Sequence, residues 1–304
     1  MRQNQPRPIF LGIGPPKTAT SWMHKSLRQH PQANLPPMKE IGYWWAKSFL
    51  PQRHYFSRFF DPHWFYRESR SYWRDSCRQH FQSLKAGHLD MSKLGWDVHY
   101  FWGFHTESWY RNLFKPHLVS GDITPKYCEL EAEAIAQIKR RYPDLKIIIS
   151  VRDPVERAWS RAKYKLGLQR NRQIQDIPEA EWFTYFDNPL QTLASDYQAL
   201  YTRWSQFFAP EQLHLIFYDQ VQDDAWTVFN RLCEFLELSL LPEAAKKQIV
   251  RPANVGLSGK IPTQYEAYLF KKHQAAMCRF AEAFPDYFYP KNWLELHEES
   301  LKSS

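Results

Sequence analysis

Cysteine is scarce in this chain of 304 residues, and its four cysteines lie far apart in the sequence. Cys77, Cys128, Cys233 and Cys278 form no C-x-x-C pair. Zinc sites and small disulfide-stapled domains place their cysteines at short, repeated spacings. The spacing here argues against both, and we expect four reduced thiols.

Long apolar runs are also missing. No stretch approaches the roughly 20 apolar residues that span a bilayer, and residues 1–7 are polar, without the apolar core of a signal peptide. We therefore expect a cytoplasmic protein with no stable membrane insertion. Hydrophobic residues make up 43% of the chain, which supports a globular core. The length of 304 residues suffices for one large domain or two small ones.

Acidic residues are fewer than basic ones, and the formal charge is +8. The basic residues are scattered, and the sequence has no helix-turn-helix, zinc-finger or RNP-like pattern. We therefore expect a small anionic ligand and no nucleic-acid partner. Nothing in the sequence indicates an oligomeric state.

The most informative stretch lies near the N-terminus. Residues 9–13 form an apolar run typical of a buried strand, and Gly14 with the two prolines after it ends that strand. Lys17, Thr18, Thr20 and Ser21 then gather where a helix to about His30 begins. The free N–H groups of a helix start attract anions, so this stretch predicts a phosphate site.

This stretch is not an ordinary ATP-binding loop. That pattern needs glycine directly before its lysine, and Pro16 precedes Lys17 here. We also find no acidic strand end suited to a magnesium ion. A capped helix with an exposed Lys17 is the simpler alternative.

A second candidate phosphate site follows the β-branched run at residues 145–151. Asp153 suits a helix N-cap, and Pro154 suits the first helical position. Arg152 would supply a forked, permanent positive charge, and Ser160 lies two turns along the predicted helix. The alternative is a capped helix with Glu156 and Arg157 in surface ion pairs.

Predicted strands alternate with predicted helices along most of the chain. The strands are the runs at 9–13, 118–123, 145–151 and 212–218, with a short one at 33–35. This alternation predicts an α/β fold with an open parallel sheet flanked by helices. Ligands in such folds bind at the carboxyl ends of the strands, where both candidate phosphate sites fall.

Lys17-Thr18-Ala19-Thr20-Ser21 resembles the K-x-G-T-[TS] loop of sulfotransferases that use 3′-phosphoadenosine 5′-phosphosulfate (PAPS). Arg152 to Ser160 resembles their R-[DN]-P-x-x-R-x-x-S motif. The resemblance implies a single domain over residues 1–304 with a P-loop-NTPase-like sulfotransferase fold, PAPS as donor and no metal. Ala19 replaces the usual glycine, which the loop tolerates unless this position needs a positive φ.

The resemblance also implies roles for individual residues. Residues 17–22, from Lys17 to Trp22, would bind the 5′-phosphosulfate, and Arg152 and Ser160 would bind the 3′-phosphate. A loop at residues 251–260 resembles the family's late basic loop over the nucleotide. From it we select Arg251, Gly259 and Lys260, although any surface loop has a similar composition.

Lys39-Glu40-Ile41-Gly42-Tyr43-Trp44 resembles the K-E-x-x-[FYW]-[FYW] segment of the heparan-type and related bacterial branches. The resemblance implies that Glu40 is the general base, because a hydroxyl becomes a good nucleophile only as its proton is removed. Lys39 would then lie on the acceptor side. A surface Lys–Glu pair is the alternative.

Residues 122–127 resemble the [DE]-x-[ST]-P-x-Y segment of the same branch. Asp122 and Lys126 would border the acceptor, although a structural turn explains Asp122 equally well. The heparan-modifying enzymes commonly have lysine after the acid, and this chain has Ile123. That difference weakens the case for a sulfated polysaccharide acceptor.

Aromatic residues are concentrated at residues 43–110, where they occupy 21 of 68 positions. A helical insertion packed on the sheet and an acceptor-binding cover with aromatic walls are both consistent with this composition. His80, His99 and His105 are rival candidate bases there. We expect a polar loop at 165–190 and a frayed tail at 296–304.

The function predicted from these segments is sulfuryl transfer from PAPS to a hydroxyl of a carbohydrate, lipid or small-molecule acceptor. Lys17 would neutralise charge on the leaving nucleotide, and Glu40 would take the acceptor proton. A P-loop-like nucleotide kinase and a non-catalytic polyanion-binding protein remain as alternatives.

Overall fold

The computed structural model describes residues 6–50, 67–251 and 259–303, apart from the side chains of residues 67 and 68. Part of the aromatic-rich region (51–66) and most of the predicted late loop (252–258) therefore lie outside the described residues. The other predicted segments can be compared with the structure.

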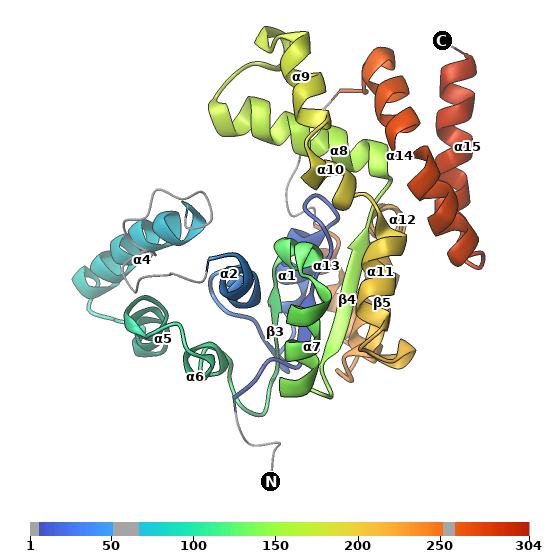
Figure 1. Cartoon of the computed structure of the whole chain (residues 1–304). Helices are drawn as coiled ribbons and strands as arrows, with labels where there is room; N and C mark the ends of the chain where they lie inside the picture. Colours follow the sequence, from blue (N-terminus) through green and yellow to red (C-terminus); the bar gives the residue numbers. More distant parts are fainter. Residues whose placement is uncertain (1–5, 51–66, 252–258, 304) are drawn as a thin grey trace.

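A parallel sheet of five strands forms the centre of the described fold (Figure 1). Its strands are β1 (Phe10–Gly12), β2 (Ala33–Asn34), β3 (Val119–Ile123), β4 (Lys146–Val151) and β5 (Leu213–Phe217), in the order β2-β3-β1-β4-β5. This confirms the predicted open parallel α/β sheet. After β1 the chain crosses toward β2, whereas after β4 it crosses toward β5. The carboxyl ends of β1 and β4 therefore flank the position where such sheets bind ligands.

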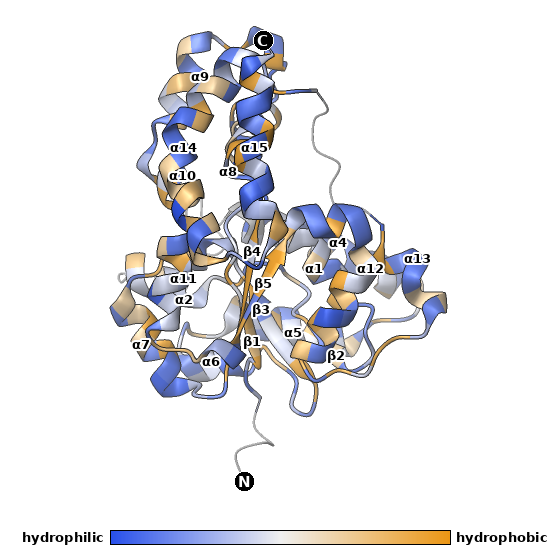
Figure 2. Ribbon diagram, turned by 90° about the vertical axis from the view of Figure 1, so that its right-hand side faces the viewer, coloured by the Kyte–Doolittle hydropathy of each residue, from blue (hydrophilic) through white to orange (hydrophobic). Residues whose placement is uncertain are grey.

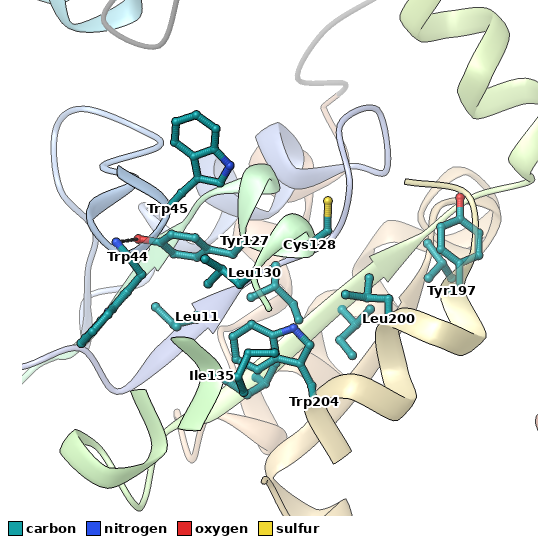
Figure 3. Packing of buried hydrophobic residues seen from close by; sticks show 14 of the residues in the cluster. Leu11, Trp44, Trp45, Tyr127, Cys128, Leu130, Ile135, Tyr197, Leu200 and Trp204 are labelled. Carbon is teal, nitrogen blue, oxygen red and sulfur yellow. Dashed lines mark hydrogen bonds between the residues drawn. The ribbon is translucent and has the colours of Figure 1, made fainter. Parts of the chain in front are cut away.

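Alternating residues of the strands point to the two faces of the sheet. Leu11, Ile147 and Ile149 pack on one face with α7 (Ala132–Arg141) and α11 (Tyr197–Ser205). Figure 3 shows part of this cluster, where Leu11 lies near Ile135 and Trp204. The apolar side of α7, with Ile135 and Ile138, thus covers this face of the sheet.

The other face of the sheet has a separate core. Phe10, Ile148 and Ile216 pack there against α1 (Thr20–Leu27), α12 (Tyr218–Phe235) and α13 (Lys246–Ile249). Figure 2 shows the two groups of helices on opposite sides of the strands. Both faces are buried, which explains why the strands read as continuous apolar runs rather than alternating ones.

Further helices lie beyond the carboxyl end of β4 (Figure 1). They are α8 (Pro154–Ala162), α9 (Glu179–Phe186), α10 (Pro189–Leu193), α14 (Thr263–Ala283) and α15 (Phe288–Lys302). Two predictions are wrong here. The predicted loop at 165–190 contains α9, which buries Trp182 and Phe186, and the predicted frayed tail is helical to Lys302.

The described part of the aromatic-rich region is helical. It comprises α2 (Tyr43–Phe49), α4 (Arg67–Lys85), α5 (Met91–Trp102) and α6 (Glu107–Arg111). Helices α4, α5 and α6 lie to one side of the sheet, away from α14 and α15 (Figure 1). Among the described residues, no helix is long and apolar enough to cross a membrane.

Candidate functional site

The loop between β1 and α1 has a constrained backbone. Lys17 and Ala19 adopt positive φ angles of 79° and 72°, a conformation that residues other than glycine, asparagine and aspartate rarely adopt. Ala19 is the N-cap of α1 and offers no side-chain cap. The position where the family pattern has glycine is therefore one that needs a positive φ, and alanine is strained there.

Strand β4 holds this loop in place. The Thr18 hydroxyl donates to the carbonyl of Pro15 at 2.7 Å and forms a hydrogen bond with the Ser150 hydroxyl, also at 2.7 Å. Gly14 lies so close to Ser150 that a Cβ atom would come within 2.0 Å of its Oγ. These contacts bury Thr18 and hold the loop between β1 and β4.

Positive charges surround Lys17. Its ammonium lies over the ring of Tyr164, 4.5 Å from the centroid. Burial, followed by the positive charges of Arg161, Arg152, Lys39 and Lys163, lowers the pKa of Lys17 to about 8. Such a collection of like charges is costly unless an anion joins it. The charge distribution therefore fits an anionic ligand beside the start of α1.

Strand β4 ends directly at the second predicted phosphate site. Asp153 is the N-cap of α8, where its Oδ1 accepts from the backbone N–H groups of Val155 and Glu156 at 2.8 and 3.2 Å. Pro154 is the first helical residue. The predicted cap is thus confirmed. Ser160 is half-buried two turns further along the same helix.

The side chain of Arg152 is held by its neighbours. Its Nη2 donates to Glu156 Oε2 at 3.0 Å, and its guanidinium lies 4.3 Å from the ring centroid of Tyr218. The Tyr197 hydroxyl donates to its backbone carbonyl at 2.6 Å. Arg152 and Lys17 are close enough for the charge of Arg152 to lower the lysine pKa. The structure thus brings the two predicted phosphate sites together.

The predicted base lies beside the phosphate loop. Lys39 Nζ donates to Glu40 Oε1 at 2.9 Å and to the hydroxyls of Thr20 and Ser21 at 3.3 and 3.2 Å. One ammonium therefore connects the start of α1 with the carboxylate of Glu40. Glu40 has a φ of 63°, which adds a third strained residue to the same site.

Asp122 lies inside the protein. It is 1% exposed, and it accepts hydrogen bonds from the hydroxyls of Thr124, Tyr127 and Tyr110 at 2.7, 2.5 and 3.3 Å. Burial raises its pKa to about 6, against the opposing effect of these hydrogen bonds. Any contribution of Asp122 to acceptor binding would therefore be indirect.

Two of the hydroxyls that donate to Asp122, those of Thr124 and Tyr127, also accept hydrogen bonds from the segment that follows Glu40. Thr124 Oγ1 accepts from the backbone N–H of Gly42 at 3.1 Å, and the Tyr127 hydroxyl accepts from that of Trp44 at 3.4 Å (Figure 3). The two segments predicted to lie on the acceptor side, residues 39–44 and 122–127, are thus joined by hydrogen bonds at the start of α2. Lys126 Nζ lies 4.8 Å from the ring centroid of Trp45.

Two other parts of the predicted donor site stay predictions. Trp22 is 5% exposed and donates from its indole to the carbonyl of Ile249 at 2.9 Å, within the core under α1. Arg251, Gly259 and Lys260 are exposed, and Gly259 has a φ of 116°. The residues between Arg251 and Gly259 lie outside the described chain.

The histidines of the aromatic-rich region have structural partners. His80 Nε2 lies 2.7 Å from Asp97 Oδ2, and His99 Nε2 lies 3.0 Å from the carbonyl of Trp109. The His105 ring lies 4.6 Å from the ring of Trp109, centroid to centroid. These contacts fit the structural alternative better than a role as base.

A cavity of about 270 Å³ lies between α4 and α5, with Trp73 and Trp102 in its wall and Asp97 at its polar end. Asp97 accepts hydrogen bonds from Tyr72, Ser76 and Lys93 as well as the contact with His80. Burial opposes the ionised form, yet these hydrogen bonds lower the pKa of Asp97. The charge of Asp97 is therefore compensated within the helical region.

The sequence missed several residues near the donor site. Arg157, considered above as a surface residue, is fully buried and donates to Gln191 and Ser195. Tyr164, under the ammonium of Lys17, lies in a π-helical turn (Lys163–Gly167). The family motif has an arginine at the position of Arg157, but no role was assigned to it, and no local signal indicated Tyr164.

No group of three or more His, Cys, Asp or Glu side chains is placed to hold a metal ion in residues 6–50, 67–251 and 259–303. The sequence had implied that no metal is needed, and this remains a prediction.

Comparison with known proteins adds a family assignment. The model of a family described as "Sulfotransferase family" matches residues 8–243. Mouse heparan sulfate glucosamine 3-O-sulfotransferase 3B1 is 30% identical over 165 residues, which are 50% of this chain and 40% of the mouse protein. This chain thus aligns with less than half of the length of that curated relative.

Solved structures share the fold. A sulfotransferase from Alicyclobacillus acidocaldarius has a TM-score of 0.61 at 21% identity, over 94% of this chain and 98% of its own. Mouse sulfotransferase SULT7A1, solved in complex with PAP, has a TM-score of 0.50 at 14% identity, over 96% and 89%. The predicted sulfotransferase fold is confirmed.

Proposed function

Because this chain belongs to the sulfotransferase family, we propose that it transfers a sulfuryl group from PAPS to the hydroxyl group of an acceptor. The observation that carries this proposal is the position of Lys17 at the start of α1, where the positive charges of Arg152, Arg161, Lys39 and Lys163 act on it. PAPS carries phosphate at both its 5′ and 3′ positions, and the charge of Arg152, from the second predicted phosphate site, acts on Lys17 in the first.

The residues would divide the chemistry as follows. The acceptor oxygen forms a bond to sulfur while the bond from sulfur to the 5′-phosphate oxygen breaks. Glu40 takes the acceptor proton, and Lys17 stabilises the negative charge that develops on the leaving phosphate oxygen. Lys39, bonded to both Glu40 and the hydroxyls of α1, keeps the base beside the donor loop.

Donor selectivity would rest on Arg152 and Ser160. Arginine matches the geometry of phosphate oxygens with a fork of N–H donors, and the stacking on Tyr218 and the ion pair with Glu156 orient that fork. A nucleotide without the 3′-phosphate would leave these groups without their ligand. The acceptor is a hydroxyl compound, and Ile123 still favours one other than a heparan-like chain.

Calorimetric titration of the desulfated product, 3′-phosphoadenosine 5′-phosphate (PAP), tests the donor site. We expect PAP to bind at least about 100-fold more tightly than 5′-AMP, because two charge-assisted hydrogen bonds are lost with the 3′-phosphate. Arg152→Ala should remove most of that preference. Arg140→Ala, an exposed arginine on α7, is the matched control and should retain it.

Other outcomes would support the two alternatives. Tight binding of ATP with magnesium and indifference to PAP would favour a nucleotide kinase. Binding of polyanions that falls steeply with salt, with no nucleotide preference, would favour a polyanion-binding protein. Either result would overturn the proposed donor.

A further inference from the structure

His297 of α15 makes a buried contact with the donor-site motif. Its Nε2 lies 2.8 Å from Asp153 Oδ2, and its Nδ1 lies 2.6 Å from Glu266 Oε1 of α14. The His297 side chain is 7% exposed. Ser300 of α15 donates to the second oxygen of Glu266 at 3.1 Å. The start of α8 therefore meets the two C-terminal helices, more than 100 residues later in the sequence, at one imidazole.

The partners of His297 define its charge state. Both ring nitrogens face carboxylate oxygens, which only accept hydrogen bonds, so both nitrogens must donate. Burial lowers the pKa of His297, but the hydrogen bonds and charges of Asp153 and Glu266 outweigh that effect and raise the pKa to about 9. The group is therefore a buried cation between two anions, and each contact is a charge-assisted hydrogen bond.

This bridge is linked to the donor site through Asp153. The Oδ1 atom of Asp153 caps α8, and its Oδ2 atom takes the His297 contact. The residue before Asp153 is Arg152, and α8 carries Ser160. A change in the orientation of Asp153 would shift the start of α8 and, with it, both predicted ligands of the 3′-phosphate.

The other end of the bridge lies beside the predicted late loop. Glu266 is in the first turn of α14, which begins at Thr263, three residues after Lys260. Helix α14 also packs along α8, where Tyr265 lies 5.6 Å from Trp159, centroid to centroid. His297 thus connects the helix of the R-D-P motif with the helix that follows the late loop. Both C-terminal helices lie outside the 8–243 match to the family model.

We propose that His297 is a positioning residue of the donor site, and that the bridge from Glu266 through His297 to Asp153 sets the selectivity for a 3′-phosphate. This inference rests on the proposed function. It assigns the C-terminal helices a role in donor recognition rather than in fold stability alone.

The test compares His297→Gln with the wild-type protein by titration of PAP and 5′-AMP. We expect the ratio of the two dissociation constants to fall about tenfold in the variant, which corresponds to one weakened charge-assisted contact. The KM for PAPS should rise while kcat and the KM for the acceptor stay unchanged. His30→Gln is the matched control, because His30 is a buried histidine whose ring nitrogens contact the Ser239 carbonyl and the Gln32 N–H, and it should keep the wild-type ratio.

A wild-type ratio in folded His297→Gln would overturn the inference and leave the proposed donor intact. No preference for PAP in the wild-type protein would instead overturn the proposed function, and the inference with it. Should His297→Gln fail to fold, Glu266→Gln keeps the contact with Asp153 and replaces only the distant carboxylate. An unchanged ratio in that variant would likewise contradict the proposal.

Discussion

The donor-side loops and the helical region at α4–α6 both gather charged side chains, but the two regions differ in how those charges are compensated. On the donor side, burial and then the positive charges of four other residues lower the pKa of Lys17, although two of those residues, Arg152 and Lys39, each contact a glutamate. In the helical region, Asp97 receives hydrogen bonds from Tyr72, Ser76 and Lys93 and contacts His80. An excess of one sign of charge, as around Lys17, favours a ligand of the opposite charge, whereas charge that a region compensates internally stabilises the fold.

Backbone strain follows the same division. Lys17, Ala19 and Glu40 adopt positive φ angles around the donor loop, whereas no residue other than glycine does so within the described residues 67–114. Strain of this kind persists where the surroundings force it, and it is concentrated at functional sites. The comparison therefore predicts that donor-side substitutions change function and that substitutions in the helical region change stability.

The largest expected effect is on catalysis. Lys17→Ala should lower the rate of sulfuryl transfer about 10³-fold, because a positioned cation is lost where negative charge develops. Binding of polyanions should barely change. Lys25→Ala, an exposed lysine on the same helix, should retain the wild-type rate in a product-formation assay. Transfer at the wild-type rate in Lys17→Ala would contradict the assignment.

The opposite behaviour is expected at Asp97. Asp97→Ala should lower the free energy of unfolding by about 3 kcal/mol, because a lysine and several other donors lose a buried partner. Affinity for PAP in the folded variant should not change. Asp75→Ala, at an exposed aspartate of α4 that is 3.9 Å from Arg78, should change stability by less than about 0.5 kcal/mol. Urea titration measures the free energy of unfolding of both variants. An Asp97→Ala variant of wild-type stability with weakened PAP binding would contradict the assignment of Asp97 to fold stability.

The pH dependence of PAP binding should show the lowered pKa of Lys17. An anion binds the protonated lysine better, so affinity should be highest below the free-protein pKa of about 8 and fall by up to about tenfold per pH unit above it. In Lys17→Arg the affinity should stay constant from pH 7 to about pH 9.5, since arginine remains charged. An identical decline in both proteins would assign the effect to another group.

The smallest expected effect concerns strain. Ala19→Gly should raise the free energy of unfolding by about 0.5 kcal/mol, because relief of the positive φ exceeds the entropy that glycine adds to the unfolded chain. Ala162→Gly, within the helix α8, should lower it by about 1 kcal/mol. Urea unfolding distinguishes the two signs. A loss of stability in Ala19→Gly would show that position 19 is not strained.

The sheet and the donor site could be predicted because their signals are local. A strand, its turn and the following helix start occupy consecutive residues. Arg152 stands directly after one apolar run, and Lys17 follows another after a turn of three residues. The structure confirms the parallel sheet and the cap at Asp153. The assigned roles of Glu40 and Ser160 come from the family resemblance and stay predictions.

The features that were missed depend on partners far away in the sequence. The buried guanidinium of Arg157 donates to Gln191 and Ser195, which lie 34 and 38 residues further along the chain. The tail at 296–304 looked polar and unstructured, yet His297 has its partner 144 residues earlier. The prediction of a loop followed the polar residues at 169–176 and overlooked the aromatic run of α9, Trp182 to Phe186. Local composition cannot reveal such tertiary partners.

The order of the strands has a consequence for how such a protein can diversify. The chain leaves the sheet at Asn34, forms α2 and the helices α4 to α6, and returns at Val119 to place β3 between β2 and β1. Lys17, Glu40 and Arg152 all lie outside the stretch that encodes α4 to α6. Recombination within this single stretch of the gene could therefore exchange the helical region without altering any strand or proposed reacting group, as long as the new α6 keeps the contact of Tyr110 with Asp122.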